Sequence, residues 1–233
     1  MRSERTTIDC GDLPVRAINR EIRAAAAGGS KSILLLNPAA RHNLGVALAG
    51  GVHVTIEGSA GYYVAGLSDG ATVEVRGGAG WGAAESMRAG TVVIDGDAGN
   101  AVGASIRDGT VVVRGDASTR AGIAMKGGAL IVGGRAGPMA GFMMQKGVAI
   151  VCGDAADGVA DSMYAGTVYV GGATGELGAD AVDDEFTPAD RDLVFGLLER
   201  WKVPAPKTFR KLIAGRKLWN FQQADLHLWK SAL

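Results

Sequence analysis

A glycine that recurs every 19 residues through the middle of the chain constrains the fold more than any other feature of the sequence. Two residues before each of these glycines stands a β-branched apolar residue, and another apolar residue stands two positions earlier. This alternation predicts a short strand with one apolar face. The fixed period indicates a stacked repeat and not a flexible tract. The glycine column consists of Gly58, Gly77, Gly96, Gly115, Gly134, Gly153 and Gly172.

The apolar residues also fall into columns when the units are aligned at this period. Because neighbouring strands lie about 4.8 Å apart, each column would be buried as a ladder inside a coil. We therefore predict an all-β repeat fold, a right-handed single-stranded parallel β-helix of 19-residue coils. Right-handed crossovers predominate among parallel strands, and 19 is not a multiple of the hexapeptide unit that left-handed β-helices favour. The columns include Val73, Val92 and Val111, then Val75, Ile94 and Val113, then Met87, Ile106, Met125, Met144 and Met163, and the small residues Ala65, Ala84, Gly103, Gly122, Gly141 and Ala160.

The repeat divides the chain into three parts. Residues 1–29 form an N-terminal segment with a capping helix, residues 30–175 form the parallel β-helix, and residues 176–233 form a linker, a helix and an arm. Terminal repeats are usually atypical, because each of them has a neighbour on one side only.

The N-terminal segment predicts a short amphipathic helix over residues 12–27. Asp12 is a candidate N-cap, Pro14 lies in the first turn, and apolar residues share one face. Such a helix would cover the open end of the stack, where unpaired backbone groups would otherwise attract other chains. A degenerate first coil is expected one period before Val54, at Leu35.

The C-terminal part changes composition abruptly. Residues 176–192 hold seven carboxylates against one arginine, and residues 202–217 carry six Lys or Arg and no acid. Between these segments, Thr187 followed by Pro188 and an apolar stripe predicts a helix over residues 188–201 that covers the last coil.

The helical or irregular C-terminal arm is also rich in large aromatic residues, since seven of the 13 aromatics lie after residue 180. A short appendage cannot easily bury so many rings in a core of its own, so it should dock on the β-helix or on another chain. Aromatic residues beside basic ones are typical of a protein interface. The residues predicted to form a partner interface are Trp201, Phe209, Arg210, Lys211, Trp219, Phe221 and Trp229.

The glycine loops invite comparison with phosphate-binding loops, of which GSAG at 58–61 and GDAG at 96–99 are examples. A phosphate-binding loop opens a helix and occurs once, whereas these loops recur without a strand, turn and helix context. We therefore interpret the column as structural glycines at tight corners that need a positive φ. The calcium-binding nonapeptide repeat is excluded because its period differs.

Other reactive residue types form no recognisable site, and we predict no catalytic, cofactor-binding or metal-ligating residue. The acids Asp95, Asp97, Asp116 and Asp154 are interpreted as scattered turn residues, so a glycan-active β-helix enzyme is the disfavoured alternative. His42 and His53 have no nucleophile near them in the sequence. Cys152 is expected to face outward or to line a turn, and the aligned methionines are expected to be core.

Composition restricts the environment and the partners. The 24 basic residues balance 24 acidic ones, which does not favour nucleic acid or an anionic membrane. Two distant cysteines and three histidines exclude a disulfide scaffold and a zinc site of usual spacing. No long apolar run or signal peptide is evident, so a cytoplasmic protein is expected.

Several segments resemble the GXGXG family, the β-helix found as the C-terminal domain of large glutamate synthases and as a separate subunit in related complexes. The most specific segments are NPAARHNL at 37–44, GYYVAG at 61–66 and LGAD at 177–180. They are similar to stand-alone glutamate-synthase-like subunits, including the small subunit of N-methylglutamate synthase. Subunits of the formylmethanofuran dehydrogenase C type share the glycine repeats.

The resemblance implies a hetero-oligomeric flavoenzyme in which this chain is a non-catalytic scaffold. It would join a class II glutaminase-like amidotransferase subunit to a synthase subunit that binds FMN and iron–sulfur clusters, with no cofactor in this chain. The reaction expected first is transfer of methylamine to glutamate with release of ammonia, which makes N-methylglutamate. A glutamate synthase or formylmethanofuran dehydrogenase-type complex is the alternative.

Overall fold

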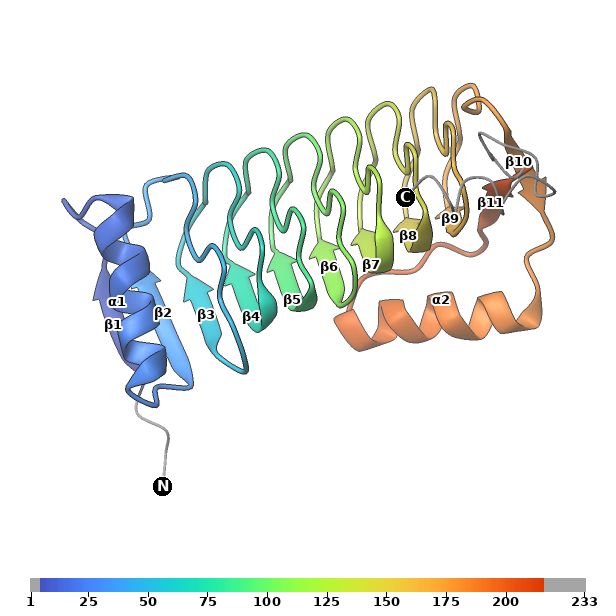
Figure 1. Ribbon diagram of the computed structural model, residues 1–233. Coiled ribbons are helices and arrows are strands. Elements are labelled where there is room, and N and C mark those ends of the chain that lie inside the picture. The colour runs from blue at the N-terminus through green and yellow to red at the C-terminus, as the bar shows by residue number, and fades with distance from the viewer. Residues whose placement is uncertain (1–4, 216–233) are drawn as a thin grey trace, which may run out of the picture.

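The chain forms a stack of coils with one strand per coil, and these strands line up in a single 11-stranded sheet (Figure 1). The computed structural model describes residues 5–215. Strands β1 to β9 are parallel neighbours in sequence order, and β11 and β10 follow β9 in antiparallel pairing. The predicted parallel β-helix is thus confirmed. The elements are β1 (Thr6–Asp9), α1 (Val15–Ala27), β2 (Ser32–Leu36), β3 (His53–Ile56), β4 (Asp69–Val75), β5 (Ala89–Ile94), β6 (Thr110–Val113), β7 (Lys126–Val132), β8 (Lys146–Val151), β9 (Thr167–Val170), β10 (Ala181–Asp184), α2 (Pro188–Trp201) and β11 (Arg210–Ala214).

The apolar columns fill the inside of the coils as predicted. Val92 pairs with Val73 on one side and with Val111 on the other, and all three side chains are fully buried. The methionine column is equally buried, with Met87, Met125 and Met144 at 0% exposure. A second ladder of single bridges joins one residue per coil, which is a buried alanine from Ala60 to Ala155 and Thr174 in the last coil. Stacking of β3 to β9 with inward residues paired 19 positions apart therefore accounts for the aligned apolar columns.

The N-terminal helix closes the first end of the stack, as expected. Ile18 and Ile22 of α1 are fully buried against the core. The helix begins after Pro14, which is its N-cap, so the prediction of Asp12 as the cap was wrong. The sequence pattern did not predict strand β1, which pairs with β2 and forms the N-terminal edge of the sheet.

The register of the degenerate first coil differs from the prediction. Ile33 pairs with Val54, and Leu35 pairs with Ile56, so this coil is longer by two residues than the 19-residue period. Because side chains alternate along a strand, a shift of two keeps both Ile33 and Leu35 inside, where they are fully buried. The apolar pattern alone could not distinguish the two registers.

The role assigned to the glycine column has to be corrected. Of its seven members only Gly58 has a positive φ, so the others do not need glycine for backbone freedom. They need it for space, because a Cβ on Gly96 would lie 2.9 Å from the amide nitrogen of Gly78 and 3.0 Å from the carbonyl carbon of Gly77. The amide of Gly96 donates to the carbonyl of Gly77 at 2.9 Å, and the next coils repeat this bond. Glycine thus lets adjacent backbones touch.

Positive φ values occur instead at the opposite turn of each coil, at alternate residues. Ala101, Gly103 and Ser105 have φ of 60°, 68° and 55°. The amide of Ala101 donates to the following coil, at Thr119, and that of Gly103 to the preceding coil, at Ala83. The turn is therefore bonded to both neighbours, and small residues suit it because bulky ones rarely adopt this conformation.

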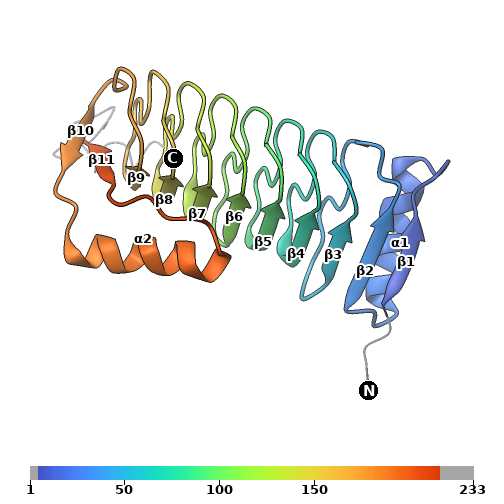
Figure 2. The ribbon, with the colours of Figure 1, turned by 180° about the vertical axis from the view of Figure 1, so that it is seen from behind.

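Helix α2 has the bounds predicted for it and lies outside the coils. Thr187 caps it in a capping box with Asp190, and it ends at Lys202, which has a φ of 53°. Figures 1 and 2 show α2 running along the stack axis, from the C-terminal end back across several coils. Among the described residues, neither helix is long and apolar enough to cross a membrane.

Candidate functional site

The outward-facing residues of the sheet change from polar to apolar along the stack, and this change determines where α2 packs. In β3 and β4 the central outward residues are Thr55 and Glu74, whereas from β5 onward the corresponding residues are apolar. Val194 and Leu198 of α2 pack on this apolar column and are 0% and 1% exposed. The helix therefore covers the sides of several coils, whereas the sequence analysis placed it over the last coil. The column consists of Val93, Val112, Ile131, Ile150 and Tyr169.

This docking face was missed although the sequence contains its signal. The strands VTI and VEV alternate apolar and polar residues, whereas VVI, VVV and LIV are apolar throughout. A strand that is apolar on both faces is buried on both faces. The first apolar outward residue, Val93, thus marks where the surface covered by α2 and the C-terminal segment begins.

Two residues of the predicted partner interface belong to this outer core within the chain. Phe209 is 4% exposed and contacts the rings of Phe186 and Phe195 at centroid distances of 6.0 and 5.9 Å. Trp201 packs at the edge of the same cluster, and its indole nitrogen is buried without a hydrogen-bond partner among the described residues. The interface prediction itself stays untested.

Two further residues of that set, Arg210 and Lys211, form ion pairs on β11. Arg210 binds Asp183 through two bonds of 2.5 and 2.8 Å, and Lys211 lies 2.8 Å from Asp184 and 3.1 Å from Asp190. The acidic linker and the basic arm thus neutralise each other across the β10 and β11 pair. Trp219, Phe221 and Trp229 lie outside the described residues.

A polar cluster around Asp190, in the first turn of α2, fixes the helix to the sheet. Asp190 accepts hydrogen bonds from the hydroxyl groups of Thr187 and Tyr169 and from the Lys211 ammonium. Burial opposes the ionisation of Asp190, but these hydrogen bonds outweigh it and hold the pKa well below its usual range. Burial, and then the contact with Asp190, raise the pKa of Tyr169. Because every member serves a structural contact, the cluster is not a candidate acid and base pair.

The other end of α2 is held by Arg114. Its guanidinium donates to the carbonyl oxygens of Trp201 and Lys202 at 3.0 and 3.3 Å, and it also lies 3.1 Å from Asp95. A cation at a helix C-terminus offsets the partial negative charge of the unpaired carbonyl groups. Asp95 is therefore part of an ion-pair chain beside the outer core.

Cys152 faces outward from its coil, as predicted, but the outer layer covers it. The side chain is 8% exposed and lies in the cluster under α2. Burial raises the pKa of its thiol to about 11. A thiol with so high a pKa is almost wholly protonated near neutral pH and is therefore a poor nucleophile.

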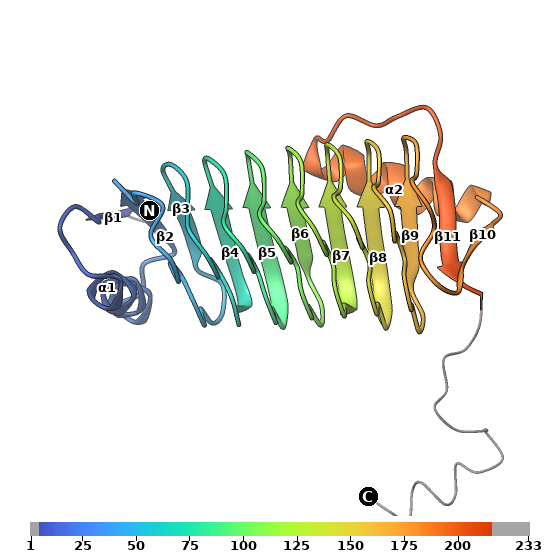
Figure 3. The same cartoon turned by 90° about the horizontal axis from the view of Figure 1, so that it is seen from above.

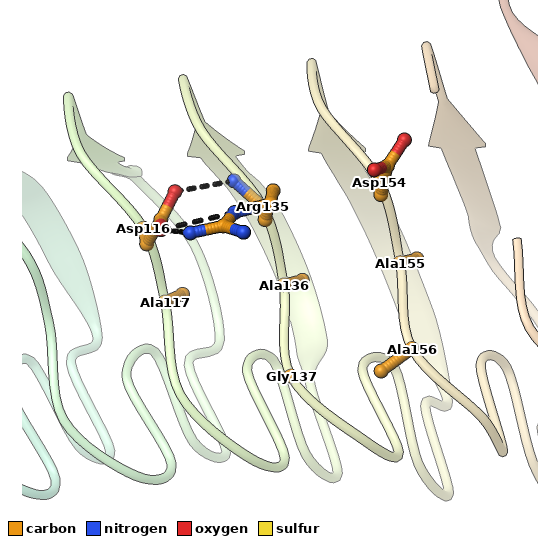
Figure 4. A pocket seen from close by; sticks show the side chains of 8 residues that line it. All are labelled: Asp116, Ala117, Arg135, Ala136, Gly137, Asp154, Ala155 and Ala156. Carbon is orange, nitrogen blue, oxygen red and sulfur yellow. Dashed lines mark hydrogen bonds and ion pairs between the residues drawn. The ribbon is translucent and has the colours of Figure 1, made fainter. Parts of the chain in front are cut away.

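The remaining acids are not scattered, because Asp97, Asp116 and Asp154 occupy one column beside the glycine ladder. Asp116 accepts the backbone N–H of Arg135 at 2.7 Å and lies 2.8 Å from its guanidinium (Figure 4). Asp97 and Asp154 accept an N–H from their following coils in the same way. An open hollow of about 350 Å³ is lined by Asp116, Arg135 and Asp154, and otherwise by alanine and glycine. These carboxylates serve as caps for the corner amides.

The two histidines of the sequence analysis have separate contacts, since His53 lies 3.3 Å from Glu74 and His42 belongs to an aromatic stack. His42 stacks on Tyr62 at 4.3 Å, and Tyr62 stacks on Trp81 at 5.0 Å. The Nδ1 of His42 accepts the backbone N–H of Tyr62 at 2.9 Å. Within residues 5–215 no group of three His, Cys, Asp or Glu side chains could hold a metal ion.

Comparisons with known proteins support the fold and go no further. No protein-family profile matches the chain, and no curated protein matches it. A solved structure is similar, with a TM-score of 0.65 and 24% identity over 85% of each chain. It is described as the formyltransferase/hydrolase complex (FhcABCD) from Methylorubrum extorquens, in complex with methylofuran. The likeness shows a shared β-helix architecture, and the resemblance to the GXGXG family has no support from the family profiles.

Proposed function

We propose that this chain is a non-catalytic scaffold subunit of a hetero-oligomeric enzyme complex. The observation that carries the proposal is the similarity over 85% of both chains to a chain of a multisubunit formyltransferase/hydrolase complex. The contacts support it, because Asp116, Asp190, Cys152 and His42 are engaged in caps, ion pairs and packing. A rigid stack with long flat sides suits a subunit that holds others in place.

The complex proposed first is of the glutamate-synthase type, in which methylamine and glutamate give N-methylglutamate and ammonia. The segments NPAARHNL, GYYVAG and LGAD carry this choice. The partners would be a class II glutaminase-like amidotransferase subunit and an FMN and iron–sulfur synthase subunit, in the cytoplasm. In this arrangement the present chain supplies contacts and no reacting group.

The second candidate is a β-helix subunit of a formyltransferase/hydrolase or formylmethanofuran dehydrogenase-type complex. The structural similarity favours it, since that structure contains such a complex with methylofuran bound. A glutamate synthase that handles ammonia is a variant of the first proposal.

Co-expression of the tagged full chain with the proteins encoded beside its gene tests these proposals. A stable complex with a glutaminase-like chain and a flavin-containing chain is expected, and incorporation of ¹⁵N-methylamine into N-methylglutamate would identify the reaction. Isolation with formyltransferase-like chains would select the second candidate. Recovery of the chain alone, with hydrolysis of a polysaccharide by the pure chain, would contradict the scaffold role.

A further inference from the structure

Four basic side chains form a line along the edge of the sheet at which the strands begin. We call Arg88, Arg107, Lys126 and Lys146 the basic stripe. Arg88 directly precedes β5, Arg107 precedes β6, and Lys126 and Lys146 are the first residues of β7 and β8. Lys126 and Lys146 are register partners, and Arg107 and Lys126 are one 19-residue period apart. Because coils stack at about 4.8 Å, the four charges follow one another at close spacing.

The basic stripe is exposed and scarcely neutralised by this chain. All four side chains are exposed. Arg88 lies 3.6 Å from Asp69, a pair in which the side chains are 69% and 50% exposed. Within residues 5–215, Arg107, Lys126 and Lys146 have no carboxylate oxygen within 4.0 Å, and Asp108 beside Arg107 accepts the N–H of Gly109. Like charges at this spacing repel one another and favour a negatively charged occupant.

An exposed apolar patch adjoins one end of the basic stripe. It consists of Tyr63 and Leu67, whose exposed fractions are 47% and 57%. A hollow of about 240 Å³ is lined by these two residues and Ser86 among others, and a second hollow of about 410 Å³ is lined by Leu67, Ser86, Arg88 and Arg107. Since Leu67 and Ser86 border both hollows, the apolar patch and the stripe form one continuous surface.

Helix α2 leaves this surface free. Figure 3 shows α2 at the arrowhead ends of the strands, whereas the stripe lies at the edge where the strands begin. The carboxylates of this chain's acidic linker do not neutralise the stripe, because Asp183 and Asp184 pair with Arg210 and Lys211.

We propose that the basic stripe and its apolar patch bind an acidic segment of a partner subunit, with carboxylates along the stripe and an apolar side chain against Tyr63 and Leu67. An apolar centre beside a charged rim is typical of a protein interface. The zero net charge of the chain favours an acidic polypeptide over nucleic acid, which requires a wider positive field. The inference rests on the proposed scaffold function and names one of its docking surfaces.

The test uses the full chain, the double variant Arg107→Glu with Lys126→Glu, and the matched control Arg16→Glu with Arg20→Glu, whose residues are exposed on α1. The affinity for the co-expressed partner subunits should fall at least about tenfold in the stripe variant and stay unchanged in the control. A photo-crosslinker at position 67 should capture a partner segment rich in Asp and Glu, and changing these to Lys should restore binding of the stripe variant. Equal affinity of wild type and stripe variant would overturn the proposal while leaving the scaffold function intact.

A second experiment tests the binding surface independently of the scaffold function. A fluorescein-labelled peptide that alternates Glu with Leu and Ser should bind the wild-type chain, lose affinity as salt rises, and fail to bind the stripe variant, even if no complex with the expected subunits is recovered. Tighter binding of an oligonucleotide of equal charge would assign the stripe to nucleic acid and overturn the proposal. Absence of peptide binding, or self-association of the chain that only the stripe variant abolishes, would overturn it as well.

Discussion

At the scale of single residues, the glycine column shows how a repeat sets the distance between backbones. The corner of each coil lies so close to the preceding one that a methyl group would meet carbonyl and amide atoms. Gly58 is the only glycine of this column that has a positive φ. The cost of substitution therefore comes from crowding, which a stack of coils cannot relieve without moving a whole coil.

Gly96→Ala should lower the free energy of unfolding by about 1–3 kcal/mol, because the new Cβ would lie 2.9 Å from the backbone of Gly78. Gly196→Ala in α2 is the matched control, since nothing lies within 4 Å of a Cβ there. That change should stabilise the protein by about 0.5–1 kcal/mol, since alanine favours a helix. Urea titration of both variants measures the difference, and equal effects would refute the crowding argument.

Cys152 makes stability depend on pH in the alkaline range. Its pKa is raised from 9.0 to about 11 in the folded chain by burial, so the unfolded chain releases the proton first. The contribution of the thiol is complete below pH 9 and is lost as the pH rises toward 11, with a limit of roughly 3 kcal/mol. The difference in unfolding free energy between wild type and Cys152→Ala should shrink over this interval. A difference that is constant with pH would show that the thiol is not buried as described.

At the scale of elements, α2 depends on a switch in the outward residues of the strands. The helix packs on the column that begins at Val93, and its ends are fixed by Asp190 and by Arg114. The same helix would have no apolar surface to cover over β3 and β4, where Thr55 and Glu74 point outward. Its position along the stack thus follows from the apolar column and not from the helix alone.

Leu198→Ala should cost about 2–5 kcal/mol, because Leu198 is 1% exposed between α2 and the sheet. Leu193→Ala in the same helix is the control, and at 44% exposure it should change the unfolding free energy far less. Thermal and urea denaturation of the two variants provide the comparison. Similar losses in both would mean that α2 is not seated on the outer column.

At the scale of the whole molecule, both ends of the stack are closed by elements outside the repeat. Helix α1 covers the first coil, and β11 pairs with the free edge of β9. Arg210 and Lys211 hold β11 against the acidic linker, so the arm has a capping role within the chain. An uncapped parallel stack would present its edge to other chains.

Deletion of residues 203–233 should expose the edge of β9, lower the melting temperature and cause self-association. Deletion of residues 216–233 leaves every described contact of β11 in place and should preserve both the melting temperature and the oligomeric state of the isolated chain. Calorimetry and light scattering distinguish these outcomes. If the longer deletion also left the melting temperature and the oligomeric state unchanged, the arm would be dispensable for folding and available to a partner.

The local pattern of the sequence was sufficient for the repeat. The period and the inward columns such as Val73 and Val92 follow from residues that recur one coil apart, the capping signal at Thr187 follows from residues within one turn, and all three are confirmed. The two-residue register change at Leu35 was hidden because it keeps the same side chains inside.

The tertiary structure decided what depends on distance between coils. The contact distance between Gly96 and Gly77, the seating of α2 on the outer column, and the pairing of β11 with β9 depend on packing that the sequence pattern does not specify. The basic stripe belongs to this class, since its charges become neighbours only when the coils stack at strand spacing. Sequence periodicity specifies which residues share a column, whereas packing specifies which columns are covered and which are left for a partner.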